Sequence, residues 1–249
     1  MIKVILLGIV QGLTEFLPVS SSGHLAILEH YFKIEEPVVM AAFLHLGTFL
    51  ATVIYFRKPL AELIAGVFRR DRDSLRYLLF IVIANIPIGL FALFFRSTIE
   101  STFSDLKIIA VFLGLSGACV LFTSLVSKGT KRVGFIQAIV IGVGQMFAVF
   151  PGLSRSGLTI SSAMFSGVEP VQAFKFSFIM SLPAILGANL LELKGTSGFG
   201  HPVEMFAGLL VSLVVGLVAL RLLSGLVKKH FYIFGFYCLL ISALMLLLL

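Results

Sequence analysis

Two short Ser/Gly-rich motifs contain most of the side chains in this sequence that could do chemistry. The first reads GIVQGLTEFLPVSSSGHL over residues 8–25 and carries Glu15 and His24. The second reads GVGQMFAVFPGLSRSGLT over residues 142–159 and carries Arg155 among serines. One motif therefore supplies a carboxylate and an imidazole, and the other supplies a guanidinium.

The segment Ser154-Arg155-Ser156-Gly157 has the composition of a phosphate-binding site. A guanidinium gives bidentate hydrogen bonds to phosphate, hydroxyl groups add donors, and the N–H groups at the start of a helix add partial positive charge. The segment Ser20-Ser21-Ser22-Gly23 offers the same hydroxyl and amide donors. Two anion-binding turns that face each other favour a diphosphate over a carboxylate.

Glu15 and His24 add groups that binding alone does not need. A carboxylate can orient an imidazole, or hold a divalent cation together with Gln11, and an imidazole can take a proton from a serine or a water molecule and return it. Such a set fits phosphoryl transfer, in which positioning and charge stabilisation supply most of the catalysis.

The composition indicates that these motifs sit in a membrane. Of the 249 residues 59% are hydrophobic and 12% are charged, whereas a soluble domain is about 45–50% apolar and about 25% charged. The mean hydropathy is +1.09. Six stretches have about the 20 apolar residues that a membrane-spanning helix needs. They are residues 38–56, 77–95, 107–126, 171–191, 203–221 and 231–249.

The basic residues predict how these helices are oriented. Twelve Lys and Arg residues lie in three connectors, within 57–76, 128–132 and 221–229, and only five lie in the connectors of the opposite set. By the positive-inside rule the first set is cytoplasmic, so both termini face outward. The basic residues form no single stripe, which argues against a nucleic-acid partner.

Residues 2–32 and 133–167 are apolar runs that Pro, Gly and Ser interrupt in the middle. They predict two re-entrant helix-loop-helix segments, because backbone left unpaired at a tip is tolerated only where protein or a water-filled cavity receives it. The two tips are therefore expected to line a shared polar cavity.

The two broken segments are related by duplication. At an offset of 134, residues 2–23 match residues 136–157 at eight positions. Three crossings follow each copy, and because three is odd the copies enter the membrane from opposite faces. The predicted fold is an all-α polytopic membrane bundle of inverted-topology repeats, with six transmembrane helices. It is expected to form a single domain, 1–249, of two repeats, 1–126 and 133–249.

Simpler interpretations remain for several residues. Pro18 and Pro151 could mark helix kinks only, although kinks do not require an arginine at membrane depth. His45 is expected to be a packing residue on an apolar helix face. Cys119 and Cys238 lie far apart in apolar runs, which predicts neither a disulfide nor a metal site.

The motifs over residues 11–24 and 151–159 closely resemble the two signatures of bacterial undecaprenyl-diphosphate phosphatases, also called bacitracin resistance proteins. The resemblance implies an enzyme of the bacterial cytoplasmic (inner) membrane that hydrolyses undecaprenyl diphosphate to undecaprenyl phosphate. Such an enzyme recycles the lipid carrier of cell-wall glycans. Its active site would open to the outer side of the membrane, and a divalent cation, Mg²⁺ or Ca²⁺, would assist.

Carried over by motif position, Glu15 and His24 are similar to the catalytic pair of that family, and Arg155 to its phosphate-binding arginine. Ser21 is similar to the serine proposed there as nucleophile or proton partner, and a phosphoserine intermediate and direct attack by water both stay open. Glu15 is the expected metal ligand, but Gln11 stands where the motif admits Glu or Gln, which leaves the ligand set open. The expected substrate-binding residues are Gln11, Ser20, Ser22, Ser154, Ser156 and Thr159.

A transporter or flippase is the alternative, because secondary transporters are also built from inverted repeats with broken helices. The unduplicated Glu15 and His24 favour catalysis, since a carrier of an anion gains little from a carboxylate beside its ligand. The expected partners are a polyprenyl diphosphate and the lipid bilayer, and a homodimer is a further expectation.

Overall fold

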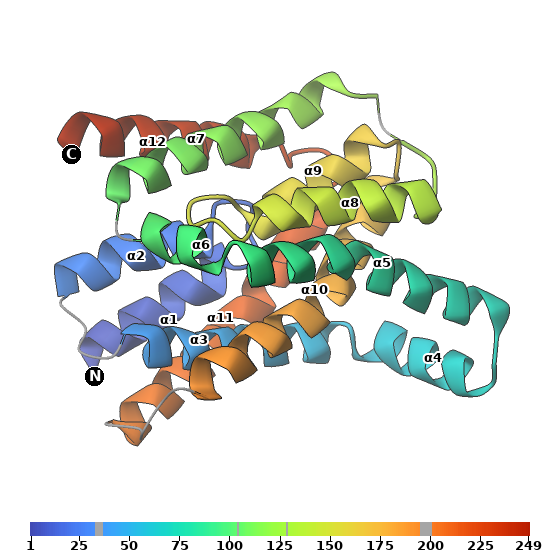
Figure 1. Ribbon diagram of the computed structural model, residues 1–249, viewed down its shortest axis with the longest axis horizontal. Coiled ribbons are helices and arrows are strands. Elements are labelled where there is room, and N and C mark those ends of the chain that lie inside the picture. Colours follow the sequence, from blue (N-terminus) through green and yellow to red (C-terminus); the bar gives the residue numbers. More distant parts are fainter. Residues whose placement is uncertain (33–36, 104, 128, 195–200) are drawn as a thin grey trace.

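The computed structural model describes the chain except residues 33–36, 104, 128 and 195–200, and its described part is helical (Figure 1). The described residues form no strand beyond one isolated bridge between Lys131 and Val168. The helices are α1 (Ile2–Thr14), α2 (Ser21–Phe32), α3 (Pro37–Tyr55), α4 (Arg57–Phe68), α5 (Arg72–Phe94), α6 (Arg96–Thr102), α7 (Leu106–Phe122), α8 (Phe135–Phe147), α9 (Arg155–Phe165), α10 (Pro170–Lys194), α11 (Pro202–Leu226) and α12 (Ile233–Leu248). A short 3₁₀ turn, Thr123–Leu125, follows α7.

Five of these segments are long and apolar enough to cross a membrane: Val38–Tyr55, Arg72–Phe94, Leu106–Leu125, Pro170–Leu191 and Pro202–Leu226. They correspond to five of the six stretches predicted from sequence. The sixth stretch forms α12, which is apolar but has 16 residues. The two interrupted runs are pairs of shorter helices, α1 with α2 and α8 with α9.

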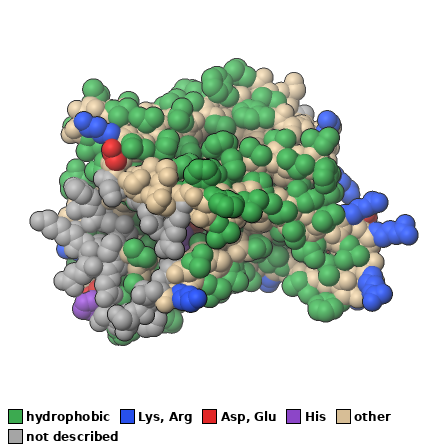
Figure 2. Space-filling view, in the orientation of Figure 1, with side chains coloured by type: hydrophobic (Ala, Val, Ile, Leu, Met, Phe, Trp, Pro, Cys, Tyr) green, Lys and Arg blue, Asp and Glu red, His purple; other side chains and the backbone are tan. Residues whose placement is uncertain are grey.

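The outer surface of the bundle is apolar. On α5 only 11% of the most hydrophobic stretch is buried, and Leu93 and Phe94 near its end are 77% and 78% exposed. Figure 2 shows hydrophobic side chains over most of one face, with Lys and Arg gathered at the end where α4 meets α5. A surface of this kind is stable where lipid replaces water, and the chain is a multi-pass membrane protein.

The basic connector 57–76, for which the sequence analysis predicted no helix, is partly helical. Residues 57–68 contain Leu, Ala and Glu, which favour helix, and they form α4. Asp71 then caps α5 by accepting hydrogen bonds from the N–H and the hydroxyl of Ser74, at 2.9 and 2.8 Å. The Ser74 backbone bond, followed by the hydroxyl bond, holds the pKa of Asp71 below its ordinary value.

The first helix of each predicted repeat packs closely against a helix of the other repeat. A Cβ atom added to Gly12 on α1 would lie 2.8 Å from Val215 Cβ of α11. A Cβ atom added to Gly142 on α8 would lie 2.8 Å from the carbonyl oxygen of Ala84 on α5. Glycine permits these close helix contacts. The contacts fix the ends of α1 and α8, and therefore the positions of the two breaks that follow.

Candidate active site

The two helix breaks have the same local hydrogen bonding. In the first, Ser20 Oγ accepts a hydrogen bond from the N–H of Gly23 at 3.3 Å. In the second, Ser154 Oγ accepts one from the N–H of Gly157 at 3.1 Å, which caps α9. Ser and Gly are suited to such turns because a serine hydroxyl replaces the missing intrahelical acceptor. Ser20 also has a positive φ of 66°, so it turns the chain sharply at the start of α2.

A second pair of contacts in each break joins neighbouring serines. Ser22 Oγ lies 3.3 Å from Ser20 Oγ, and Ser156 Oγ lies 3.3 Å from Ser154 Oγ. Ser156 also donates to the carbonyl of Leu17, at 3.3 Å. The second break therefore touches the first.

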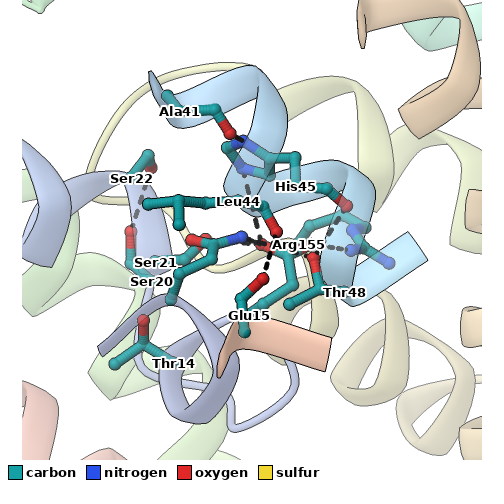
Figure 3. A network of polar contacts seen from close by, with 12 residues as sticks. Thr14, Glu15, Ser20, Ser21, Ser22, Ala41, Leu44, His45, Thr48 and Arg155 are labelled. Atoms are coloured by element: carbon teal, nitrogen blue, oxygen red, sulfur yellow. Dashed lines mark hydrogen bonds and ion pairs between the residues drawn. The ribbon is translucent and has the colours of Figure 1, made fainter. Parts of the chain in front are cut away.

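Glu15 and Arg155 form an ion pair at this meeting point. Arg155 Nη2 donates a hydrogen bond to Glu15 Oε1, across 140 positions of sequence. The two side chains are 7% and 15% exposed. Figure 3 shows Glu15, Arg155 and His45 pointing toward one another from the first break, α9 and α3. The structure thus brings the carboxylate of one motif against the guanidinium of the other.

The second oxygen of Glu15 collects three further neighbours. Ser21 Oγ donates to Oε2 at 2.7 Å and Gln11 Nε2 donates to it at 3.2 Å. His45 Nε2 lies 3.7 Å from the same oxygen. A buried carboxylate needs such partners, because burial without them costs several kcal/mol. Ser21 is the hydroxyl placed to give its proton to Glu15.

The guanidinium of Arg155 has partners on two sides and, among the described residues, an unpaired N–H group on a third. Its guanidinium carbon lies 5.9 Å from the centroid of the Phe178 ring, within the range of a cation–π contact. Phe178 in turn packs on Phe16 of the first break, with ring centroids 5.6 Å apart. Arg155 Nη1 is buried and has no hydrogen-bond partner among the described residues. An unpaired guanidinium N–H is a site for an anionic oxygen.

His24 does not contact Glu15 in the described hydrogen-bond network. Its Nδ1 lies 2.8 Å from the carbonyl oxygen of Ser20, and its Nε2 lies 2.8 Å from the hydroxyl of Tyr237 on α12. The Ser20 carbonyl and the Tyr237 hydroxyl, and not Glu15 as predicted, therefore orient the ring of His24. The histidine beside Glu15 is His45, which the sequence had assigned to packing.

The predicted substrate-binding residues fall into three groups. Gln11 is fully buried beside Glu15, and four serines lie in the two turns: Ser20, Ser22, Ser154 and Ser156. Thr159 lies apart from the cluster: its hydroxyl donates to the carbonyl of Arg155 at 2.7 Å and lies 2.6 Å from Ser177 Oγ. These bonds hold the first turn of α9 against α10, and the predicted contact of Thr159 with phosphate stays a prediction.

Sequence reasoning missed three residues of the site. His45 and Thr48 lie on α3, and Thr48 Oγ1 lies 3.4 Å from Gln11 Nε2. Tyr237 lies on α12. In the sequence, these three residues stand out only as polar groups within apolar helices. The packing of the helices decides which of such polar groups face the site.

The donor set does not fit a metal ion held by the protein alone. Among the described residues, no three His, Cys, Asp or Glu side chains lie close enough together to share an ion. Both oxygens of Glu15 already have partners, one of them the cationic Arg155. Gln11 Oε1, beside Glu15, is buried and has no hydrogen-bond partner in the described part of the chain.

The fold and the site together define a polytopic helical membrane protein with a buried acid–arginine pair at two helix breaks. The family model of the Bacitracin resistance protein BacA matches residues 4–244, and the chain belongs to that family. Relatives named undecaprenyl-diphosphatase include one from Thermosipho africanus, 42% identical over 242 residues and 96% of each chain. Another, from Methanococcus vannielii, is 43% identical over 244 residues, again 96% of each chain. A third, from Thermotoga maritima, is 38% identical over 245 residues, 96% of this chain and 97% of the relative.

Proposed function

We propose that this protein hydrolyses undecaprenyl diphosphate to undecaprenyl phosphate and inorganic phosphate. Its relatives carry the name of that enzyme over nearly their whole length. The observation that carries the proposal is the Nη1 group of Arg155, which is buried and has no hydrogen-bond partner in the described residues, at the point where the two breaks meet. A diphosphate supplies the missing anionic acceptor.

In the proposed complex, the polyprenyl tail lies along the apolar surface and the diphosphate enters the meeting point of the two breaks. Arg155 Nη1 donates to a phosphate oxygen, while the cation–π contact with Phe178 and the bond to Glu15 keep the guanidinium fixed. A fixed cation stabilises the charge that develops on the bridging oxygen as the P–O bond breaks.

The terminal phosphorus is attacked by Ser21 Oγ or by water. Ser21 already donates to Glu15 Oε2, so Glu15 accepts the proton of the attacking hydroxyl. Undecaprenyl phosphate leaves as the bond from the terminal phosphorus to the bridging oxygen breaks. If Ser21 attacks, water then cleaves the phosphoserine and releases inorganic phosphate. Radiolabel retained on Ser21 after quenching distinguishes this route from direct attack by water.

The divalent cation, Mg²⁺ or Ca²⁺, is proposed to arrive bound to the diphosphate. The described part of the protein offers too few ligand atoms to hold the ion by itself, and the positive charge of Arg155 beside Glu15 repels a cation. None of the steps above requires the protein itself to bind the cation.

The proposed setting is the cytoplasmic membrane, with six crossings, two re-entrant pairs in inverted repeats, and the site open to the outer side. The apolar surface and the basic end at α4 and α5 support this arrangement. Recycling of a cell-wall lipid carrier requires access from the side on which the carrier is released.

The decisive experiment is phosphate release from a polyprenyl diphosphate by purified protein in detergent. Arg155→Ala should lower kcat/KM by at least roughly 10³-fold, because it removes a buried charge from the transition state. The matched control is Arg221→Ala on α11, an exposed arginine at the start of the basic connector 221–229, which should leave kcat/KM unchanged. A wild-type protein that releases no phosphate in detergent, yet moves the lipid across a sealed bilayer, would be a flippase instead.

A further inference from the structure

His24 is held at both of its ring nitrogens, and the two partners define its tautomer. The Ser20 carbonyl oxygen, 2.8 Å from Nδ1, can only accept a hydrogen bond, so Nδ1 of a neutral ring carries the proton. Nε2 then presents a lone pair, and the Tyr237 hydroxyl at 2.8 Å donates to it. The nitrogen that could act as a base is therefore covered by a tyrosine.

Tyr237 reaches His24 from the last helix of the chain, 213 positions away. The two rings are nearly parallel, with an interplanar angle of 11° and centroids 5.8 Å apart. The next residue, Cys238, contacts the carbonyl of Pro18 in the first break through its sulfur at 3.4 Å. Ser242, one turn further on, donates to the carbonyl of Ala110 on α7 at 2.7 Å. These contacts fix α12 against the break, so the position of the tyrosine is set by packing.

Tyr237 is also partly open to the surroundings. It is 40% exposed, whereas the Glu15 side chain is 7% exposed. His24 thus lies between the serine turn of the first break and an exposed tyrosine on α12.

We propose that Tyr237 is a positioning residue for His24, a role that rests on the proposed function. Its hydroxyl holds the ring with Nε2 unprotonated and covers that lone pair until a diphosphate arrives. Glu15 takes the proton of Ser21, and Nε2 can take a proton from the attacking water only when the tyrosine hydroxyl turns away. A phosphate oxygen is a stronger acceptor to which the hydroxyl can turn, and Tyr237 stays neutral throughout. Entry of the substrate and release of the base are thereby coupled.

The first test is nitrogen NMR of the full chain in detergent, with ¹⁵N-labelled histidine. The His24 signals are identified by their loss in His24→Asn. In the wild type we expect a protonated Nδ1 and an unprotonated, hydrogen-bonded Nε2. Tyr237→Phe should move the Nε2 shift toward that of a free imidazole nitrogen. Tyr232→Phe, which removes a hydroxyl five positions earlier, should not move it.

The second test is phosphate release from a polyprenyl diphosphate by the same proteins. Tyr237→Phe should lower kcat by roughly tenfold, the effect of one lost hydrogen bond, and raise KM by up to about tenfold, because the hydroxyl also donates to the bound phosphate. Tyr232→Phe should match the wild type in both constants.

The outcomes separate this proposal from the proposed function. A protonated Nε2 in the wild type overturns it without any variant, so the test survives if Tyr237→Phe fails to fold. A fall in kcat with an unchanged Nε2 shift also overturns it, because the tyrosine would then act other than through His24. If the shift moves but the wild type releases no phosphate, the pairing of Tyr237 with His24 stands and the proposed function fails.

Discussion

At the scale of residues, the site depends on a buried pair of opposite charges. Glu15 and Arg155 come from different helix breaks, and each is the charged partner of the other. Removing one partner of a buried pair leaves an uncompensated charge, whereas replacing both by neutral groups of similar shape costs little. Stability and catalysis therefore respond differently to single and double substitutions here.

Glu15→Gln should destabilise the protein by about 3–5 kcal/mol, because Arg155 then lacks its carboxylate. The double variant Glu15→Gln with Arg155→Gln should recover most of that loss while phosphate release stays at the level of the more severe single variant. Thermal unfolding in detergent measures the first effect and phosphate release the second. Additive losses of stability in the double variant would show that the two side chains do not interact in the membrane.

At the scale of elements, the breaks are held in place by close packing of α1 and α8. Gly12 lies three residues before Glu15, on the helix that leads into the first break, and backbone and side-chain atoms of α11 surround it. A larger residue there must displace α1 or α11, so it should alter the position of Glu15 as well as stability.

Gly12→Ala should lower the free energy of unfolding by about 1–3 kcal/mol, because the added methyl group would lie 2.9 Å from the Ser212 carbonyl oxygen. The matched control is Gly187→Ala on α10, where an added Cβ meets no atom within 4 Å. The control should keep or slightly raise the melting temperature, since alanine favours helix over glycine. Equal melting temperatures for the two variants would contradict the close contact of α1 with α11.

The local signals in the sequence were enough to predict the five long helices and the two breaks, but not α4 or α6. Long apolar runs predict spanning helices, and the two breaks fall where Pro, Ser and Gly are clustered, whereas Pro87 alone does not end α5. Partners across the bundle were not predictable in the same way. The sequence places His24 nine residues after Glu15, yet its ring bonds Tyr237, because the rotation of α2 and α12 about their axes is decided by packing. His45 likewise faces Glu15 because of how α3 packs against the first break, and the sequence of α3 alone does not determine that packing.

At the scale of the whole molecule, the charge distribution predicts the orientation in the membrane. The basic residues of α4 and the start of α5 gather at one end of the molecule, and α6 follows at the other end of α5 (Figure 1). α5 has 23 residues, about 34 Å of helix at 1.5 Å per residue, which is enough to cross the hydrocarbon core. The positive-inside rule then assigns the start of α5 to the cytoplasm and α6 to the outer side.

A single cysteine at each end of α5 tests this orientation in a background with Cys119 and Cys238 replaced by serine. Asp73→Cys, in the first turn of α5, should react with a membrane-impermeant maleimide only in inside-out vesicles or after permeabilisation. Thr98→Cys, on α6, should react in intact cells, because it lies beyond the opposite end of the same helix. Phosphate release should be retained in both variants, since neither residue belongs to the site. Labelling of both cysteines from one side would mean that α5 does not cross the bilayer, and a reversed pattern would place the basic end outside.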